Sequence, residues 1–314
     1  MNDHVREHTT MERARIERIE LSEEERRQVA KLATELAPAF VGGESPLPTH
    51  LLGEAAGQLP ARLVAEVAQV RERRLPHACV VSGAPLLADR LEPTPQHWRE
   101  AQTVGSAVHA CVLLLVADLL GESFGWASQQ DGRVVTDVVP SPGQEDSLVS
   151  SSSRAELAWH TEDAFFEHRA DFVGLFCLRA ATGGATTVSF LDPAQLSAEV
   201  VEVLQQPRFL LRPDDAHDVH PDDLARTWLV DPADARRIRV DRDFTSAVHD
   251  DTEAARALHG LVEVLDANLQ DLPLAPGDIG FVDNAVAVHG RRSFTPRFDG
   301  TDRWLKRVNV RTRP

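Results

Sequence analysis

The sequence has little positive charge, few cysteines and no long uninterrupted apolar run. Its 33 lysines and arginines are outnumbered by 49 aspartates and glutamates, which gives a formal net charge of −16. This balance argues against a nucleic acid or an anionic membrane as partner, because either would require a basic face. It is compatible with a cationic substrate, although most of the acidic side chains are expected to be solvated surface.

The scarcity of cysteine and of apolar runs also limits where the protein acts. The three cysteines are scattered without a Cys-x-x-Cys pair, so they provide neither a disulfide framework nor a zinc-finger spacing. Residues 1–18 are charged and contain no apolar signal core. The longest apolar run, over 107–120, is interrupted by His109 and Asp118 and is too short to span a bilayer. We expect a soluble, cytoplasmic protein.

The first third of the chain has mainly helical patterns. Residues 1–20 are predicted to form a polar tail, and residues 21–122 a mostly helical support. A capping-box pattern begins at Ser22, with glutamate three residues later. Further helices are expected over 59–73 and 93–120, the latter packed under the core.

The remaining residues, 123–314, predict a β-rich unit. Short apolar runs separated by Gly, Pro and Asp are typical of an antiparallel sandwich or barrel. These runs cover 134–139, 172–178, 185–190, 238–244, 278–282 and 304–310. Helices are expected to interrupt them at 200–204 and 254–269. With no internal repeat in the sequence, a single domain over 1–314 is the best interpretation.

Three residues in this β-rich region have the chemistry of a metal centre. On a strand, residues i and i+2 face the same side, so His160 and Glu162 could reach one ion. His289 lies 129 residues downstream, followed by glycine and arginine. Two histidines and one carboxylate suit Fe(II) with open positions for a co-substrate and O₂. Zinc accepts the same ligand types, and a surface histidine beside a solvated glutamate is the alternative for the first pair.

These residues resemble the Fe(II)/2-oxoglutarate-dependent oxygenases, specifically the clavaminate synthase-like branch. The resemblance covers about residues 129–313. It implies a mainly β fold with flanking helices (α+β) and a double-stranded β-helix, or jelly-roll, core. It also implies that His160, Glu162 and His289 bind Fe(II), with 2-oxoglutarate and O₂ as co-substrates. A carboxylate at position 162 argues against the halogenating members, which lack it.

Two arginines match the needs of two carboxylates. Arg303 lies 14 residues past His289, the spacing at which this family holds the distal carboxylate of 2-oxoglutarate. A planar guanidinium suits that carboxylate because it donates two charge-assisted hydrogen bonds. Arg307 falls on the same strand face and is available for the carboxylate of an amino-acid substrate. Thr186 matches a family position whose hydroxyl contacts 2-oxoglutarate, although a simple strand threonine remains an alternative.

An acidic pair further along the chain is predicted to bind the side-chain end of the substrate. Residues 238–244 are predicted to form a strand, on which Asp241 and Asp243 share one face. Two neighbouring carboxylates repel unless a cation neutralises them, and a guanidinium with its five donors fits. The alternative is an acidic loop neutralised by the nearby arginines 236, 237 and 239.

The resemblance then narrows to arginine hydroxylases of viomycin- and streptothricin-type antibiotic pathways and to enduracididine hydroxylase. It implies that Gln129 and the free oxygen of Glu162 receive the substrate α-amino group. It also implies that Leu148 and Ser150 line the pocket and that residues 208–223 form a lid.

The sequence therefore predicts an Fe(II)/2-oxoglutarate-dependent oxygenase that hydroxylates free L-arginine at C3 or C4. The same machinery could instead desaturate arginine. Other possible substrates are enduracididine, citrulline, lysine and asparagine, but a neutral side chain does not require both aspartates. A non-catalytic jelly-roll metal-binding protein is the alternative from another class. Oligomeric state remains open.

Overall fold

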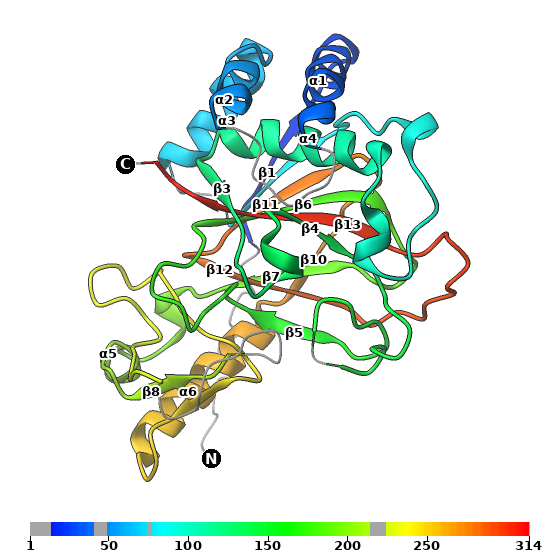
Figure 1. The fold of residues 1–314 in the computed structure, drawn as a ribbon. Helices are drawn as coiled ribbons and strands as arrows, with labels where there is room; N and C mark the ends of the chain where they lie inside the picture. Colours follow the sequence, from blue (N-terminus) through cyan, green and yellow to red (C-terminus); the bar gives the residue numbers. More distant parts are fainter. Residues whose placement is uncertain (1–13, 41–48, 74–76, 148, 214–223, 314) are drawn as a thin grey trace, which may run out of the picture.

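Two β-sheets form the centre of the molecule, with helices on the outer side of each (Figure 1). The structure is a computed structural model that describes residues 14–40, 49–73, 77–147, 149–213 and 224–313. Its strands are β1 Ile16–Glu20, β2 Ala78–Ser82, β3 Glu122–Phe124, β4 Val135–Val138, β5 Leu157–His160, β6 Phe172–Arg179, β7 Thr186–Phe190, β8 Phe209–Leu211, β9 Thr245–Ala247, β10 Gln270–Leu272, β11 Ile279–Asp283, β12 Ala287–Arg291 and β13 Trp304–Arg311. Its α-helices are α1 Glu23–Leu36, α2 Thr49–Ala56, α3 Ala61–Arg73, α4 Val104–Asp118, α5 Ala198–Leu204 and α6 Thr252–Ala267.

The larger sheet has the strand order β1-β2-β11-β6-β13-β3, with β4 also paired to β13. The smaller sheet has the order β10-β7-β12-β5 and is antiparallel throughout. In it, His289 on β12 is the register partner of His160 on β5. The pairing of these two strands therefore brings together two histidines that are far apart in the sequence.

Apolar side chains fill three layers. One core lies between the larger sheet and helices α1 to α4, and another lies beneath α5 and α6. A third joins the inner faces of the two sheets through residues such as Val80, Val188 and Val282. Helix α4 is buried on all sides, with every residue from Gly105 to Asp118 in the interior, as expected for a helix that is apolar all round. The fold is thus mainly β with flanking helices around a jelly-roll core, as predicted.

One local prediction is confirmed at the start of α1. The capping box at Ser22 is present: its hydroxyl accepts from the Glu25 backbone, and the Glu25 side chain accepts from the Ser22 backbone. No helix in the described ranges has both the length and the apolar character needed to cross a membrane.

Three local predictions require correction. The predicted polar tail includes a strand, because β1 pairs in parallel with β2 and buries Ile19. The helix expected over 93–120 begins only at Val104, where Thr103 caps it, and a 3₁₀ turn, Trp98–Ala101, precedes it. The strand expected over 238–244 is replaced by isolated bridges at Ile238 and Asp241 and a turn at 242–244.

Candidate active site and metal centre

A cavity of about 360 Å³ opens between the two sheets, a size suited to a small ligand. Val138, Leu175 and Leu305 line it from the larger sheet, and His160 and His289 line it from the smaller one. The larger sheet also contributes Asp137 and Arg307, so both walls of the cavity carry polar groups.

His160, Glu162 and His289 bring their ligand atoms together within 4.8 Å of one another. His160 ends β5, and Glu162 lies two residues beyond, in the following turn rather than on the strand itself. Oε2 of Glu162 lies 3.3 Å from Nε2 of His289 and 3.6 Å from Nε2 of His160. This oxygen is buried and accepts no hydrogen bond. A buried carboxylate oxygen aimed at two imidazole nitrogens fits a first-row divalent metal such as Fe(II).

The charges of this cluster also suit a metal. Nδ1 of His160 lies 2.9 Å from the Ala158 carbonyl, which leaves Nε2 facing Glu162. Burial lowers the pKa of His160, but the proximity and negative charge of Glu162 outweigh it and raise that pKa to about 9, so a metal ion that binds Nε2 would displace a proton. Burial raises the pKa of Glu162, yet the charge of Arg307 and the two histidines hold it well below its usual value. Glu162 is therefore ionised and available as a ligand.

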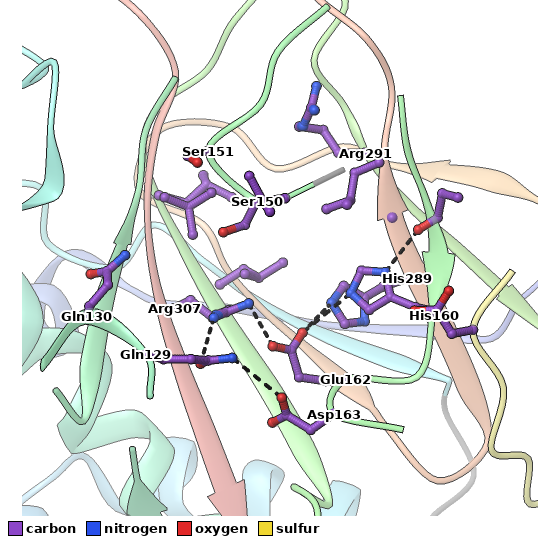
Figure 2. A pocket seen from close by; sticks show the side chains of 18 of the residues that line it. Gln129, Gln130, Ser150, Ser151, His160, Glu162, Asp163, His289, Arg291 and Arg307 are labelled. Atoms are coloured by element: carbon purple, nitrogen blue, oxygen red, sulfur yellow. Dashed lines mark hydrogen bonds and ion pairs between the residues drawn. The ribbon is translucent and has the colours of Figure 1, made fainter. Parts of the chain in front are cut away.

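Arg307 contacts the other oxygen of Glu162 and also contacts Gln129 (Figure 2). Nη1 of Arg307 lies 2.6 Å from Oε1 of Glu162, and Nη2 donates to Oε1 of Gln129 at 3.0 Å. Nε2 of Gln129 in turn lies 3.5 Å from Oδ1 of Asp163. The predicted substrate-binding residues Gln129, Glu162 and Arg307 therefore meet in one chain of polar contacts.

Two residues that position this chain were missed by the sequence analysis. Asn284 is fully buried; its Oδ1 accepts from the Glu162 backbone, and its Nδ2 donates to the Glu162 carbonyl at 3.1 Å. Asp163 has φ +52 and accepts from Nε1 of Trp126 and Nδ2 of Asn309. A buried asparagine directly after an apolar strand is a signal that could have been found, because its amide must be satisfied somewhere.

Arg303 and Thr186 also meet in the cavity. Nη2 of Arg303 donates to Oγ1 of Thr186 at 3.3 Å, and Arg303 is 6% exposed. Burial, followed by the charge of Arg291, lowers the pKa of Arg303 to about 10. A carboxylate at this position would offset both effects, because it supplies the opposite charge and two acceptors.

Asp241 and Asp243 line the cavity as predicted, but not as alternate residues of a strand. Oδ1 of Asp241 accepts from the backbone N–H groups of Asp243 and Phe244, which holds the turn. Burial raises the pKa of Asp241, with the charge of Asp243 adding to it. Arg242 pairs with Asp266 at 2.8 Å instead of facing the acidic pair.

The nearby arginines do not neutralise the acidic pair. Arg236 pairs with Asp234, Arg237 pairs with Asp231, and Arg239 donates to the Ala164 carbonyl. Asp241 and Asp243, which we call the acidic wall, therefore remain available to bind a cation.

The remaining predicted pocket residues lie partly outside the described ranges. Ser150 lines the cavity, whereas Leu148 lies outside the described residues, as does 214–223 of the predicted lid. The described part of that lid contains β8, which pairs with β9, and Arg212, which lines the cavity.

Comparison with known proteins gives consistent similarities. A family model described as taurine catabolism dioxygenase TauD, TfdA family, matches residues 113–309. An L-ornithine/L-arginine 3-hydroxylase of Catenulispora acidiphila is 36% identical, over 93% of this chain and 94% of the relative. An enduracididine beta-hydroxylase of Streptomyces hygroscopicus is 35% identical, over 81% of this chain and 82% of the relative. The crystal structure of the non-heme iron oxygenase OrfP with Fe and alpha-ketoglutaric acid superimposes with a TM-score of 0.88 at 37% identity, covering 94% of both chains.

Proposed function

The chain belongs to the TauD/TfdA family of Fe(II)/2-oxoglutarate-dependent dioxygenases, and on that premise we propose that it hydroxylates free L-arginine at C3 or C4 in specialised-metabolite biosynthesis. The observation that carries the substrate is the acidic wall of Asp241 and Asp243 in the cavity that contains the metal cluster. Similarity to an L-ornithine/L-arginine 3-hydroxylase supports it. Three buried free cysteines support a cytoplasmic location.

Each end of the cavity has a role in this proposal. His160, Glu162 and His289 hold Fe(II), and Arg303 with Thr186 holds the distal carboxylate of 2-oxoglutarate. When bound, Fe(II) supplies the activation of O₂ that is coupled to decarboxylation of 2-oxoglutarate. The overall reaction converts arginine, 2-oxoglutarate and O₂ into hydroxyarginine, succinate and CO₂.

The amino acid is clamped by charge at both ends. Arg307 binds its α-carboxylate, while Gln129 and the outer oxygen of Glu162 receive its α-amino group. Asp241 and Asp243 bind the guanidinium, and Ser150 lines the wall between the two ends. Because both ends are fixed, only the carbons between them can approach the metal, so position selects C3 or C4.

Enduracididine is a second candidate substrate. Similarity to an enduracididine beta-hydroxylase favours it, and a cyclic guanidino amino acid presents charges that match the same acidic wall. Citrulline and asparagine have neutral side chains that leave the aspartates unpaired, which disfavours them.

The test is mass spectrometry of the anaerobically purified protein supplied with Fe(II), 2-oxoglutarate, O₂ and a panel of free amino acids. Arginine that gains one oxygen, with equimolar succinate, supports the proposal. Arginine that loses two hydrogens indicates a desaturase, and oxidation of another amino acid overturns the substrate. Absence of 2-oxoglutarate consumption with every amino acid indicates a non-catalytic metal-binding protein.

A pair of histidine variants controls for the metal. His289→Ala is expected to abolish turnover and to weaken Fe(II) binding, whereas His259→Ala, in the exposed part of α6, is expected to change neither. Retained activity in His289→Ala would mean that the cluster is misassigned.

A further inference from the structure

Beyond these roles, we infer that Arg291 is a positioning residue that fixes one wall of the amino-acid pocket to the strand carrying His289. The wall is residues 149–155, Val-Ser-Ser-Ser-Ser-Arg-Ala, which we call the serine loop. The inference rests on the proposed function, since it assigns the serine loop to the amino-acid side of the cavity.

Most hydrogen bonds of the Arg291 guanidinium go to this loop. Its Nη2 donates to Oγ of Ser152 and to the Ala155 carbonyl, both at 2.9 Å. Its Nη1 donates to the Ser153 carbonyl at 3.0 Å and to the Arg292 carbonyl at 2.9 Å. Three of the four hydrogen bonds therefore end in the serine loop, and they reach it from two residues beyond His289.

The burial of Arg291 is costly for a purely structural link. The residue is 2% exposed, and its Nε is buried without a hydrogen-bond partner. In the part of the chain that the structure describes, no carboxylate pairs with it within ion-pair distance; burial lowers the pKa of Arg291 to about 10, despite the opposing charge of Glu156. Carbonyl oxygens, the Ser152 hydroxyl and the ring of Phe294, over which the guanidinium lies at 5.1 Å, are its partners. Because none of them carries a full negative charge, a neutral side chain would destabilise the fold less if the site only had to fold.

The anchored residues lie next to the ones that face the cavity. Val149, Ser150 and Ser151 line the cavity, directly before the segment that Arg291 holds. The serine loop has further supports in the backbone: the Glu145 carbonyl accepts from the N–H groups of residues 153, 154 and 155, the Ser151 carbonyl accepts from Ser141, and the Ser153 carbonyl accepts from Phe294. Release of Arg291 would leave these backbone links but would remove the side-chain hydrogen bonds to β12, and the wall beside the substrate would loosen.

The alternative role for Arg291 is that of an extra cation for 2-oxoglutarate. Its charge contributes to the lowered pKa of Arg303, so the two guanidinium groups lie near each other. The geometry favours the anchor, because all the hydrogen bonds of its terminal nitrogens go to protein acceptors. In Figure 2 its guanidinium also points away from the cluster of His160, Glu162 and His289.

The experiment compares Arg291→Lys and Arg291→Gln with Arg292→Gln, the neighbouring arginine that pairs with Asp271 and Glu156 at the surface. Lysine keeps the charge but cannot reach several acceptors with a planar fork. In both Arg291 variants, the KM for the amino acid is expected to rise about tenfold, while the KM for 2-oxoglutarate stays within about twofold. The amount of succinate formed per hydroxylated amino acid is expected to rise above that of the unsubstituted protein. A loosely held amino acid allows 2-oxoglutarate to be consumed without hydroxylation. Arg292→Gln is expected to behave like the unsubstituted protein.

Hydrogen exchange gives a readout that does not depend on the substrate. Amides of residues 149–155 are expected to exchange faster in the Arg291 variants than in Arg292→Gln. A dominant rise in the KM for 2-oxoglutarate, or unchanged exchange in the serine loop, would overturn the inference. If the Arg291 variants do not fold, Ser152→Ala removes one of the hydrogen bonds, and unchanged exchange there would also overturn it. If arginine is not the substrate, the amino-acid panel reveals it, and the exchange result still decides the role of Arg291.

Discussion

Asp241 and Asp243 line the same cavity but are engaged differently. One carboxylate oxygen of Asp241 already accepts two backbone N–H groups of its own turn, whereas Asp243 is exposed and uses only its backbone N–H in that turn. Substitution of Asp241 would therefore disturb the turn as well as the substrate, so Asp243 is the cleaner test of guanidinium binding.

Asp243→Asn is expected to raise the KM for arginine by about tenfold or more, because a charge-assisted hydrogen bond contributes about 1.5–3 kcal/mol. The KM for 2-oxoglutarate is expected to stay unchanged. Steady-state kinetics with each substrate varied in turn measures both constants. Asp250→Asn, at an exposed position seven residues further along the chain, serves as the control. Equal rises in the two constants would contradict binding of the guanidinium by Asp243.

Arg303→Lys is expected to affect the KM for 2-oxoglutarate rather than the KM for arginine. Lysine keeps the charge but loses the fork that can meet a carboxylate with two parallel hydrogen bonds, so the KM for 2-oxoglutarate should rise about tenfold. The KM for arginine should change little. The same kinetics, with the surface substitution Arg297→Lys as control, distinguishes the outcomes. A rise confined to the KM for arginine would show that Arg303 belongs to the amino-acid side.

Residue type, spacing and the family resemblance together predicted which side chains line the cavity, but they did not predict the residues that hold those side chains in place. Arg303 and Thr186 follow from the distance to His289 and from the resemblance. Asn284 and Arg291 act through backbone groups far away in the sequence, namely those of Glu162 and the serine loop. Such partners are set by how β12 packs against its neighbours, which no local pattern encodes.

At the scale of elements, the segment 238–244 shows how alternation can mislead. Its alternating residues predict a strand, but the Asp241 side chain accepts backbone N–H groups that a strand would need for its ladder. Only the middle part lies along β5, where the Val240 carbonyl accepts from the Thr161 N–H and Asp241 forms an isolated bridge with His160. Both aspartates reach the cavity because of a turn rather than a shared strand face.

The strand β12 leaves no room for a side chain at Gly290. A Cβ atom there would lie 2.5 Å from the Leu157 carbonyl oxygen and 3.0 Å from Oγ1 of Thr187, so β12 would have to move away from β5 or β7. Gly290→Ala is expected to destabilise the fold by about 1–3 kcal/mol and to weaken metal binding, because His289 is the preceding residue. Thermal unfolding and titration with a divalent metal measure the two effects.

Gly53→Ala is the matched control, since nothing lies within 4 Å of a Cβ built at that position in α2. It is expected to be neutral or slightly stabilising, because alanine favours a helix more than glycine does. A Gly290→Ala variant as stable as Gly53→Ala would show that β12 tolerates the displacement.

At the scale of the whole molecule, elements that form only by pairing with a distant segment could not be predicted from the sequence. Strand β1 is a short, charged segment that forms only because β2 offers a parallel partner 62 residues later. In contrast, the fully apolar character of α4 predicts its burial without knowledge of its neighbours. The jelly-roll core itself was predicted through the family resemblance and not through strand patterns, which left a sandwich and a barrel equally open.

The interior of the molecule also makes its stability sensitive to acid through His109, in the middle of α4. The ring is 0% exposed; Nδ1 lies 2.9 Å from the Gly105 carbonyl, and Nε2 accepts from the Leu87 backbone N–H. A neutral imidazole satisfies both contacts, whereas a second proton would face the Leu87 N–H. Burial, with the charge of Lys306 adding to it, lowers the pKa of His109 to about 4.

Between about pH 6.5 and pH 4 the unfolded chain therefore binds a proton at His109 that the native protein does not, so the free energy of unfolding falls as the pH falls. The contribution is up to about 1.4 kcal/mol per pH unit. His77, whose pKa burial also lowers to about 4, adds to the slope, so the prediction concerns a difference between variants. Denaturant unfolding between pH 7 and pH 5.5 is expected to show a shallower loss of stability in His109→Gln than in the unsubstituted protein, and an unchanged slope in the exposed control His259→Gln. If His109→Gln retained the full slope, the native protein would have to accept a proton at His109 in this range, and the neutral, doubly bonded imidazole in α4 would be the wrong description of the core.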